Sequence, residues 1–113
     1  MVKQLWKPSE ERVKGTNIYR FMNFVNEKLG KDFTEYDPLY RWSIENIPEF
    51  WTLMWEFAEI RASKPYDQVI DDVNKMPGAK WFSGVRLNFA ENLLRYRDDH
   101  VALIFKGDRK SVV

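Results

Sequence analysis

The sequence offers one histidine and seventeen carboxylates for acid–base chemistry, and none of them stands beside a nucleophile in a recognisable catalytic pattern. His100 is the only histidine, and it follows Arg97-Asp-Asp in a polar stretch between two apolar ones. General acid–base catalysis needs an imidazole or a carboxylate whose pKa is tuned by burial and by charged neighbours. The residues around His100 supply no such setting, and we expect it in a solvated loop.

Three pairs of adjacent carboxylates are the candidates for binding a hard cation: Glu10-Glu11, Asp71-Asp72 and Asp98-Asp99. Adjacent side chains point apart on any regular element, and none of the pairs lies within the ligand pattern of an EF-hand. The chain has no cysteine, which excludes disulfides and thiolate ligands. We therefore predict surface charge here, with no metal ligand and no catalytic residue in the chain.

Phosphate binding needs clustered glycines, because backbone N–H groups must approach the phosphate oxygens closely. The five glycines, at positions 15, 30, 78, 84 and 107, are scattered. Gly30-Lys31 is followed by Asp32, and Val25 stands where a Walker loop needs glycine, so the P-loop hypothesis fails. We predict no cofactor-binding residue either.

Large aromatic side chains are the remaining candidates for a binding site. Trp81-Phe-Ser-Gly84 would suit the edge of a ligand pocket, but two aromatics before a glycine turn more often pack a loop onto a core. Trp51 and Trp55, one helical turn apart, favour core or interdomain packing for the same reason. Acidic residues rather than a basic groove flank these two, which disfavours nucleic-acid binding.

Composition limits the remaining classes of protein. The 113 residues are 44% hydrophobic and 31% charged, an ordinary balance for one globular domain. Eighteen basic residues oppose seventeen acidic ones, so no strong field attracts nucleic acid or an anionic membrane. No stretch approaches a spanning helix or a secretory signal, and we expect a cytosolic protein that binds no membrane.

The elements that would position these residues are mainly helical. Residues 1–15 predict an extended arm held by one indole, that of Trp6. Residues 17–29 predict an amphipathic helix that is capped by Thr16 and stopped at Gly30. Asp37-Pro38 predicts the start of a second helix, which Pro48 ends near Ile47 while opening a third. We expect one face of the third helix to carry Ile47, Phe50, Trp51, Met54, Trp55 and Ala58.

The second half of the chain predicts shorter elements. Residues 66–73 suit a short strand or an extended crossing, and Met76-Pro-Gly78 predicts a turn. Asn88 and Glu91 resemble a capping box, which predicts a helix over 87–97. We expect Ala90, Leu93 and Leu94 to face inward on that helix.

The last apolar stretch, Val101–Phe105, has the pattern of a strand covered on both faces. Gly107-Asp108 predicts a turn, and 111–113 the start of a returning strand. An isolated hairpin is marginally stable, so this strand needs a sheet that a mostly helical chain does not offer. The sequence predicts a mainly α fold with a few short strands (α+β), truncated relative to a longer natural fold.

Five short patterns, in this order, resemble a known family: Trp6-x-Pro-Ser, Tyr36-Asp-Pro-Leu-Tyr-Arg-Trp-Ser-Ile-Glu, Phe50-Trp51, Tyr66-Asp-x-Val-Ile-Asp and Trp81-Phe-x-Gly-x-Arg-Leu-Asn-Phe-Ala-Glu-Asn-Leu-Leu. Together they resemble the N-terminal region of the acetoacetyl-CoA synthetases, which belong to the acetyl-CoA synthetase-like, adenylate-forming enzymes. The resemblance extends from about Trp6 to Phe105.

The resemblance implies that the whole enzyme uses Mg-ATP to activate acetoacetate and passes the acyl group to coenzyme A. The family's phosphate loop, its acidic signatures and its acyl-transfer lysine would all lie beyond Val113, so no functional residue is carried over. The implied organisation is an arm (1–15), a cap domain (16–97) and the start of the large-domain sheet (98–113). The implied partner is that large domain or a homologous full-length chain.

Alternatives to an inactive cap remain open at this point. A stand-alone interaction module would use the exposed aromatic surface to bind a partner. A shorter enzyme of unknown chemistry lacks any pair of nucleophile and base. Acetate or propionate in place of acetoacetate also stays open, because the acyl pocket would lie elsewhere.

Overall fold

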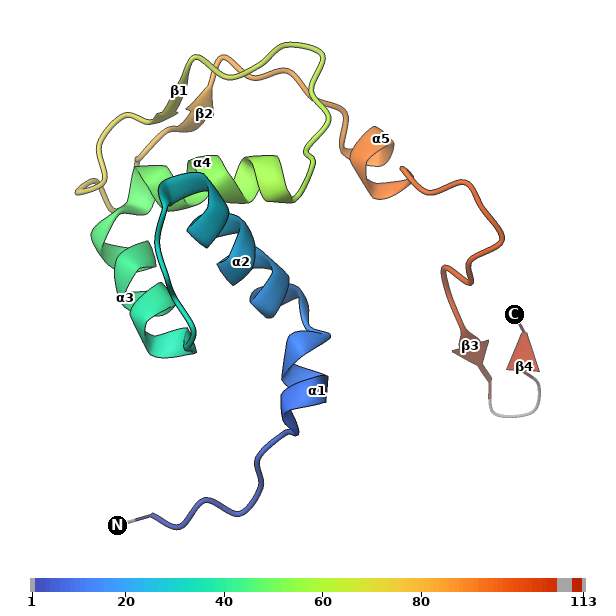
Figure 1. Ribbon diagram of the computed structural model, residues 1–113. Coiled ribbons are helices and arrows are strands. Elements are labelled where there is room, and N and C mark those ends of the chain that lie inside the picture. Colours follow the sequence, from blue (N-terminus) through green and yellow to red (C-terminus); the bar gives the residue numbers. More distant parts are fainter. Residues whose placement is uncertain (1, 108–110, 113) are drawn as a thin grey trace.

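The computed structural model describes residues 2–107 and 111–112. Four helices form one unit: α1 (Glu10–Lys14), α2 (Asn17–Leu29), α3 (Tyr36–Glu45) and α4 (Ile47–Phe57). An antiparallel hairpin of β1 (Gln68–Ile70) and β2 (Trp81–Ser83) lies along α4. α5 (Phe89–Leu93) and the pair β3 (Phe105–Lys106) and β4 (Ser111–Val112) then extend away from the helices (Figure 1). The mainly helical fold with short strands is as the sequence predicts.

α2 forms where the sequence predicts it, because both of its ends are capped. The Thr16 hydroxyl oxygen accepts a hydrogen bond from the N–H of Tyr19 at 3.3 Å. Gly30 ends the helix in the left-handed region, with φ of 64°, and its N–H donates to the Asn26 carbonyl. Phe21, Met22 and Val25 are buried along one face, so α2 is the centre of the core.

The core lies where α2, α3 and α4 meet. Phe21 packs edge-on against Phe50 at 5.7 Å between ring centroids and against Phe57 at 5.3 Å. Six buried side chains form this core: Phe21, Met22, Val25, Leu39, Trp42 and Leu53. The Asn26 side chain fixes the connection between α2 and α3, because it donates to the Phe33 carbonyl and accepts from the Phe33 N–H, both at 2.8 Å.

The N-terminal arm differs from the expected extended segment. Residues 10–14 form α1, because the Ser9 hydroxyl accepts from the Arg12 N–H and Glu10 and Glu11 occupy the first turn. Trp6 does not hold the arm to the core, since 67% of its surface is exposed. It contacts the guanidinium of Arg12 instead, 5.8 Å from the ring centroid.

α3 begins one residue before Asp37, with Glu35 at its N-cap and no side-chain hydrogen bond there. Pro38 is the third helical residue instead of the first; it still removes no helical hydrogen bond, because the first N–H groups have no partner within a helix. The expected corner at Pro48 is confirmed: α3 ends at Glu45 and α4 begins at Ile47.

α4 has two apolar faces, whereas its sequence pattern predicts one. Phe50, Met54 and Phe57 pack on the helical core, around the buried Leu53, which the expected face omitted. Trp51 and Trp55 contact the rings of the hairpin instead. The physical reason is that elements lie on both sides of α4, so its apolar residues cover more of its circumference than a single stripe.

The hairpin confirms the short strand expected within 66–73. Gln68 pairs with Ser83 and Ile70 with Trp81. The Asp71 carboxylate organises the connection, since it accepts from the N–H groups of Lys80 and Asp72. The expected turn at Met76-Pro-Gly78 is present.

The last third of the chain departs most from expectation. The helix expected over 87–97 is confined to Phe89–Leu93, and Ala90, Leu93 and Leu94 are exposed instead of facing inward. Only Phe105 of the expected strand pairs, because Val101–Ile104 have no strand beside them in the part of the chain that the structure describes. The returning strand is confirmed as β4, while Asp108 of the expected turn and Val113 lie outside the described residues.

Candidate functional site

The residues first considered for catalysis are not brought together. His100 is almost fully exposed, and its Nδ1 lies 3.7 Å from an Asp98 oxygen. The three carboxylate pairs occupy three separate places: α1, the hairpin connection and the segment after α5. Across residues 2–107 and 111–112, no three His, Asp or Glu side chains lie close enough to hold a metal ion.

Trp81 and Phe82 pack the hairpin onto α4, in line with the packing role that the sequence favours. The Trp51 and Trp81 ring centroids are 5.9 Å apart, and Trp55 lies 4.7 Å from Phe82. Tyr66 completes this cluster at 5.2 Å from both Trp55 and Phe82. Phe82 adopts a left-handed backbone, with φ of 48°, to place its ring there. We call these five rings the aromatic cluster.

Polar side chains attach α5 to the end of α4. The Asn88 side chain caps α5 by accepting from the Glu91 N–H at 3.2 Å. Asn92 accepts from the Arg61 N–H at 2.7 Å and donates to the Arg61 carbonyl at 2.8 Å. Arg95 donates to the Ala58 carbonyl at 2.8 Å, which satisfies a group left free at the end of α4. The Leu87-Asn-x-Ala-x-Asn pattern therefore positions α5.

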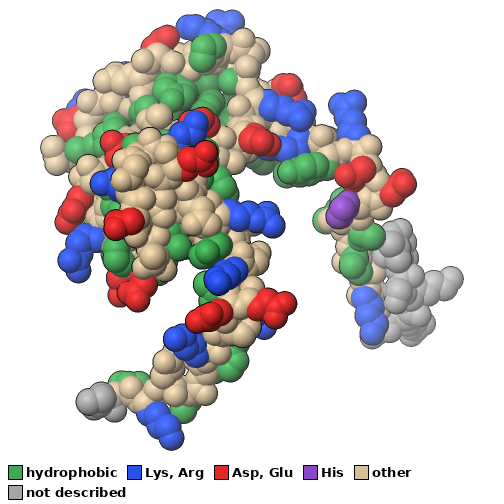
Figure 2. All heavy atoms as spheres, in the orientation of Figure 1, with side chains coloured by type: hydrophobic (Ala, Val, Ile, Leu, Met, Phe, Trp, Pro, Cys, Tyr) green, Lys and Arg blue, Asp and Glu red, His purple; other side chains and the backbone are tan. Residues whose placement is uncertain are grey.

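Once positioned, α5 and the residues after it present apolar side chains to solvent. We call residues 89–106 the C-terminal apolar segment. Leu103, for example, exposes 86% of its surface. Figure 2 shows hydrophobic side chains along this extension, beside the single histidine. The exposed large apolar residues are Phe89, Leu93, Leu94, Tyr96, Val101, Leu103, Ile104 and Phe105. Exposed apolar surface of this extent is typical of an interface.

The area of the whole chain supports the same conclusion. Its accessible surface is 10284 Å², whereas a compact protein of 13.6 kDa exposes about 6,600 Å². The excess, about 3,700 Å², exceeds the roughly 800 Å² that one partner contributes to an ordinary interface. The radius of gyration, 18.8 Å, is likewise above the roughly 13 Å of a compact domain of this length.

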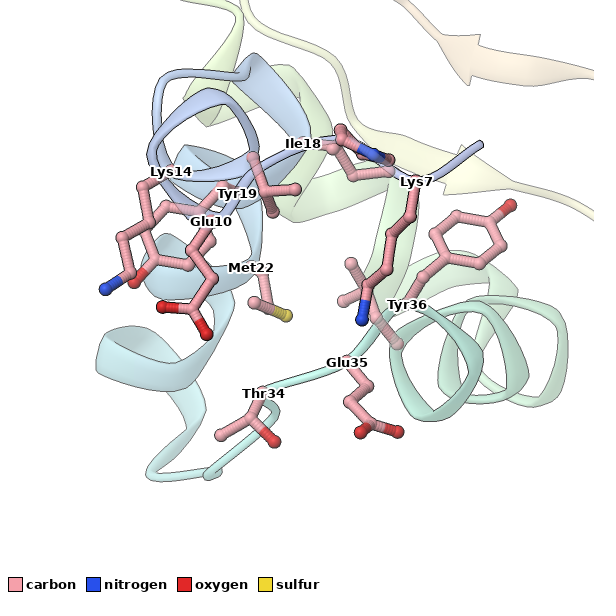
Figure 3. A pocket seen from close by; sticks show the side chains of 12 residues that line it. Lys7, Glu10, Lys14, Ile18, Tyr19, Met22, Thr34, Glu35 and Tyr36 are labelled. Carbon is pink, nitrogen blue, oxygen red and sulfur yellow. The ribbon is translucent and has the colours of Figure 1, made fainter. Parts of the chain in front are cut away.

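Several hollows lie on the helical unit, and two of them exceed 400 Å³. One, of about 530 Å³, lies between α1, α2 and the start of α3. Lys7, Glu10, Lys14 and Glu35 line it together with apolar residues, and Figure 3 shows the Met22 side chain between these charged groups. The other, of about 440 Å³, is lined without any charged residue, from Ile18 across to Phe57. These hollows have no convergent set of catalytic groups.

Among the described residues, two surface groups have shifted pKa values, Lys28 and Asp71. The Lys28 Nζ lies 2.8 Å from a Glu56 oxygen, and this hydrogen bond raises the pKa of Lys28 above its ordinary 10.5. The pair joins α2 to α4. The hydrogen bond from the Lys80 N–H lowers the pKa of Asp71 below its ordinary 3.8. Both groups stabilise local structure, and neither faces a pocket that could hold a substrate.

Comparison with known proteins shows which family of proteins shares these elements. The family model described as "Acetyl-coenzyme A synthetase N-terminus" matches residues 36–93, just over half of the chain. This range includes α3, α4, the aromatic cluster and α5.

Proteins named acetoacetyl-CoA synthetase match almost the whole chain. The protein from Danio rerio is 40% identical over 98% of this chain, and that from Xenopus tropicalis is 43% identical over 89%. The solved structure of acetoacetyl-CoA synthetase from Streptomyces lividans is 38% identical over 83% of this chain, with a TM-score of 0.76. The chain spans only 15% to 16% of the length of these relatives. The chain therefore belongs to the acetyl-coenzyme A synthetase N-terminus family and resembles the N-terminal region of acetoacetyl-CoA synthetases.

Proposed function

We propose that this chain is the N-terminal cap of an AMP-forming acetoacetate-CoA ligase and contains none of its catalytic residues. The whole enzyme would convert ATP, acetoacetate and coenzyme A to AMP, pyrophosphate and acetoacetyl-CoA. Relatives that carry the acetoacetyl-CoA synthetase name support this substrate. ATP, magnesium and coenzyme A would bind to the remainder of the enzyme, in the cytosol, and the product would enter ketone-body and lipid metabolism.

The observation that carries the proposal is the exposed apolar surface. A helical unit with a well-packed core is followed by a C-terminal apolar segment that is attached by polar contacts and covered by nothing described. The cap would place this segment against the catalytic domain, and the polar contacts of Asn92 and Arg95 would set the angle at which the two meet. The chain would thus act by packing and orientation, without touching substrate.

A complementation assay tests this role. The matching N-terminal part is removed from the acetoacetyl-CoA synthetase of Streptomyces lividans, and the remainder is assayed for AMP release with ATP, acetoacetate and coenzyme A. We expect the remainder to be impaired, this chain alone to release no AMP above background, and the two together to recover activity. Sustained AMP release by this chain alone would contradict the proposal.

A single variant tests whether the chain acts by packing against the catalytic domain. The Leu103→Lys variant places a charge in the C-terminal apolar segment and leaves the helical core unchanged. It should fail to complement while keeping the helical circular dichroism of the unaltered chain. Full complementation by Leu103→Lys would show that this segment does not contact the catalytic domain.

A further inference from the structure

Residues 2–8, which we call the arm, carry large apolar side chains that nothing in the described part of the chain covers. Leu5 exposes 92% of its surface and Trp6 67%. Among the described residues, no backbone N–H or C=O group of residues 2–7 takes part in a hydrogen bond. Burial of an indole is strongly favourable, so an exposed tryptophan on an open segment is typical of a surface that binds a partner.

The hollow beside the arm is unsuited to these two side chains. Its wall includes Lys7 and Pro8, so Leu5 and Trp6 lie just beyond its edge along the chain. Four charged side chains line it without an ion pair between them in the part of the chain that the structure describes: Lys7, Glu10, Lys14 and Glu35. An indole placed among them (Figure 3) would remove water from these charges and offer them no partner. The arm therefore needs a surface outside its own helical unit.

The arm belongs to the part of the chain that acetoacetyl-CoA synthetases match. The match to the Danio rerio protein covers 98% of the chain, so it omits only about two of the 113 residues and includes most of the arm. This chain corresponds to 16% of the length of that relative, whose remainder includes the proposed catalytic domain. A segment that accompanies such a domain, and that does not pack on its own helices, is suited to bind the domain.

We propose that the arm is a second docking element, and that Leu5 and Trp6 insert into an apolar hollow of the catalytic domain that is bordered by carboxylates. The charges of the arm specify this border, because Lys3 and Lys7 flank the two apolar residues and no acidic residue precedes Glu10. Neither lysine forms an ion pair within the described residues. Opposite charges around an apolar centre fix the orientation of a docked segment.

This inference rests on the proposed cap function and adds a contact at the other end of the chain. The arm extends beyond α1, whereas the C-terminal apolar segment extends beyond α5 (Figure 1). Two contacts on one domain strengthen each other, because the first raises the effective concentration of the second. They also fix the orientation of the cap, since a single contact leaves it free to rotate.

Alkylation of single thiols tests the arm contact, because the chain contains no cysteine of its own. The test protein is a fusion in which this chain replaces the matching N-terminal part of the Streptomyces lividans synthetase. Leu5→Cys reports on the arm, Leu103→Cys on the C-terminal apolar segment, and Glu11→Cys, on the exposed α1, is the control. Mass spectrometry of each peptide measures its rate of reaction with iodoacetamide. Leu5→Cys should react about tenfold more slowly in the fusion than in the free chain, and Glu11→Cys equally fast in both.

The three thiols distinguish failure of the arm contact from failure of the cap function. Slow alkylation of Leu103→Cys with an unchanged rate at Leu5→Cys would overturn the arm contact and leave the cap function standing. Unchanged rates at both positions would contradict the cap function and the arm contact with it. Slow alkylation of Leu5→Cys in the free chain would also overturn the proposal: a concentration-dependent rate would indicate a second copy, and a constant rate the arm's own helical unit.

Replacement of Trp6 in the Leu5→Cys fusion tests the role of the indole. Trp6→Ala should restore alkylation to within about threefold of the rate in the free chain, because the arm loses its largest buried side chain. Trp6→Phe keeps an aromatic ring and should keep the slow rate. Tyr36→Ala removes an aromatic side chain of comparable exposure, 58%, from α3 and should leave the rate unchanged. A slow rate that persists in Trp6→Ala, or an equal effect of Tyr36→Ala, would overturn the assignment of the contact to Trp6.

Discussion

The helical unit and the C-terminal apolar segment contain similar residues but differ in what those residues contact. In the helical unit, Phe21 is surrounded by Phe24, Phe50 and Phe57. In the C-terminal apolar segment, Phe89 and Phe105 face solvent. Both regions use an asparagine to hold a neighbouring backbone: Asn26 binds Phe33 and Asn92 binds Arg61. Polar contacts therefore position the segment, while its apolar residues suit a surface outside the described chain.

Removing a phenylalanine ring should change the free energy of unfolding far more in the helical unit than in the C-terminal apolar segment. Phe21→Ala opens a cavity in the core and should lower the free energy of unfolding by about 3–5 kcal/mol. Phe89→Ala should change it by less than about 0.5 kcal/mol, because 76% of Phe89 is exposed whereas only 5% of Phe21 is. Urea unfolding followed by circular dichroism measures both. Equal losses would show that the segment packs on the helices in solution.

The two asparagine contacts give the next largest difference. Asn26→Ala leaves the part-buried Phe33 backbone groups without partners and should cost about 1–3 kcal/mol of global stability. Asn92→Ala should leave the global unfolding transition unchanged, because Arg61 and Asn92 are near the surface.

Hydrogen exchange measures the second effect directly. Amides of α5 should exchange faster in Asn92→Ala, since the helix loses its attachment to Arg61. Asn92→Asp serves as the control, because the carboxylate still accepts from the Arg61 N–H and only the hydrogen bonds donated to the Arg61 and Asn88 carbonyls are lost. An unchanged exchange rate in Asn92→Ala would mean that Arg95 and Asn88 hold α5 without it.

Much of the helical unit follows from sequence because its determinants are local. Thr16, Gly30 and the apolar spacing between them specify α2, and Pro48 specifies the corner. The second face of α4 could not be predicted in the same way, since it depends on which elements pack beside Trp51 and Trp55. The roles of Asn26 and Arg95 are likewise tertiary: they bind backbone groups 7 and 37 residues away.

The C-terminal apolar segment shows what a sequence pattern cannot predict. Its apolar pattern predicted burial for Leu93, Leu94 and Val101–Phe105, yet the described chain offers no surface for them. Periodicity reports that a face suits burial but does not identify the surface that covers it. The sequence predicts Asn88 of the family motif as a helix cap, but it does not predict the contact of Asn92 with Arg61. The expected absence of catalytic residues stays a prediction.

A smaller effect, a gain of stability, is expected at the end of α4, where Arg95 attaches the C-terminal apolar segment to the helical unit. Glu59 ends α4 with φ of 52°, a left-handed backbone that costs a non-glycine residue roughly 1 kcal/mol. Glu59→Gly should therefore raise the free energy of unfolding by up to about 1 kcal/mol. Glu56→Gly, inside α4, should lower it by at least that amount, because it also removes the ion pair with Lys28. Thermal unfolding of both variants checks the sign, and destabilisation by Glu59→Gly would contradict the assignment of strain.

The smallest expected effect concerns pH. Hydrogen bonds from the Lys80 and Asp72 N–H groups, together with Lys75, lower the pKa of Asp71 in the folded chain. Its contribution to stability is therefore complete above the ordinary value of 3.8 and is lost as pH falls through the lower folded value. Asp71→Asn should make the melting temperature less dependent on pH below about 4. Identical pH profiles for the variant and the unaltered chain would contradict this role.

Hydrogen exchange of this chain with and without a catalytic domain tests whether the C-terminal apolar segment docks on that domain. The domain is the Streptomyces lividans acetoacetyl-CoA synthetase without its matching N-terminal part, added at a concentration where this chain alone is monomeric. We predict that amides of Val101–Ile104, which lie outside α5 and β3, exchange rapidly in the free chain and become protected on addition, while α2 is protected in both states. Protection of Val101–Ile104 in the free chain, or none after addition, would contradict the proposed docking.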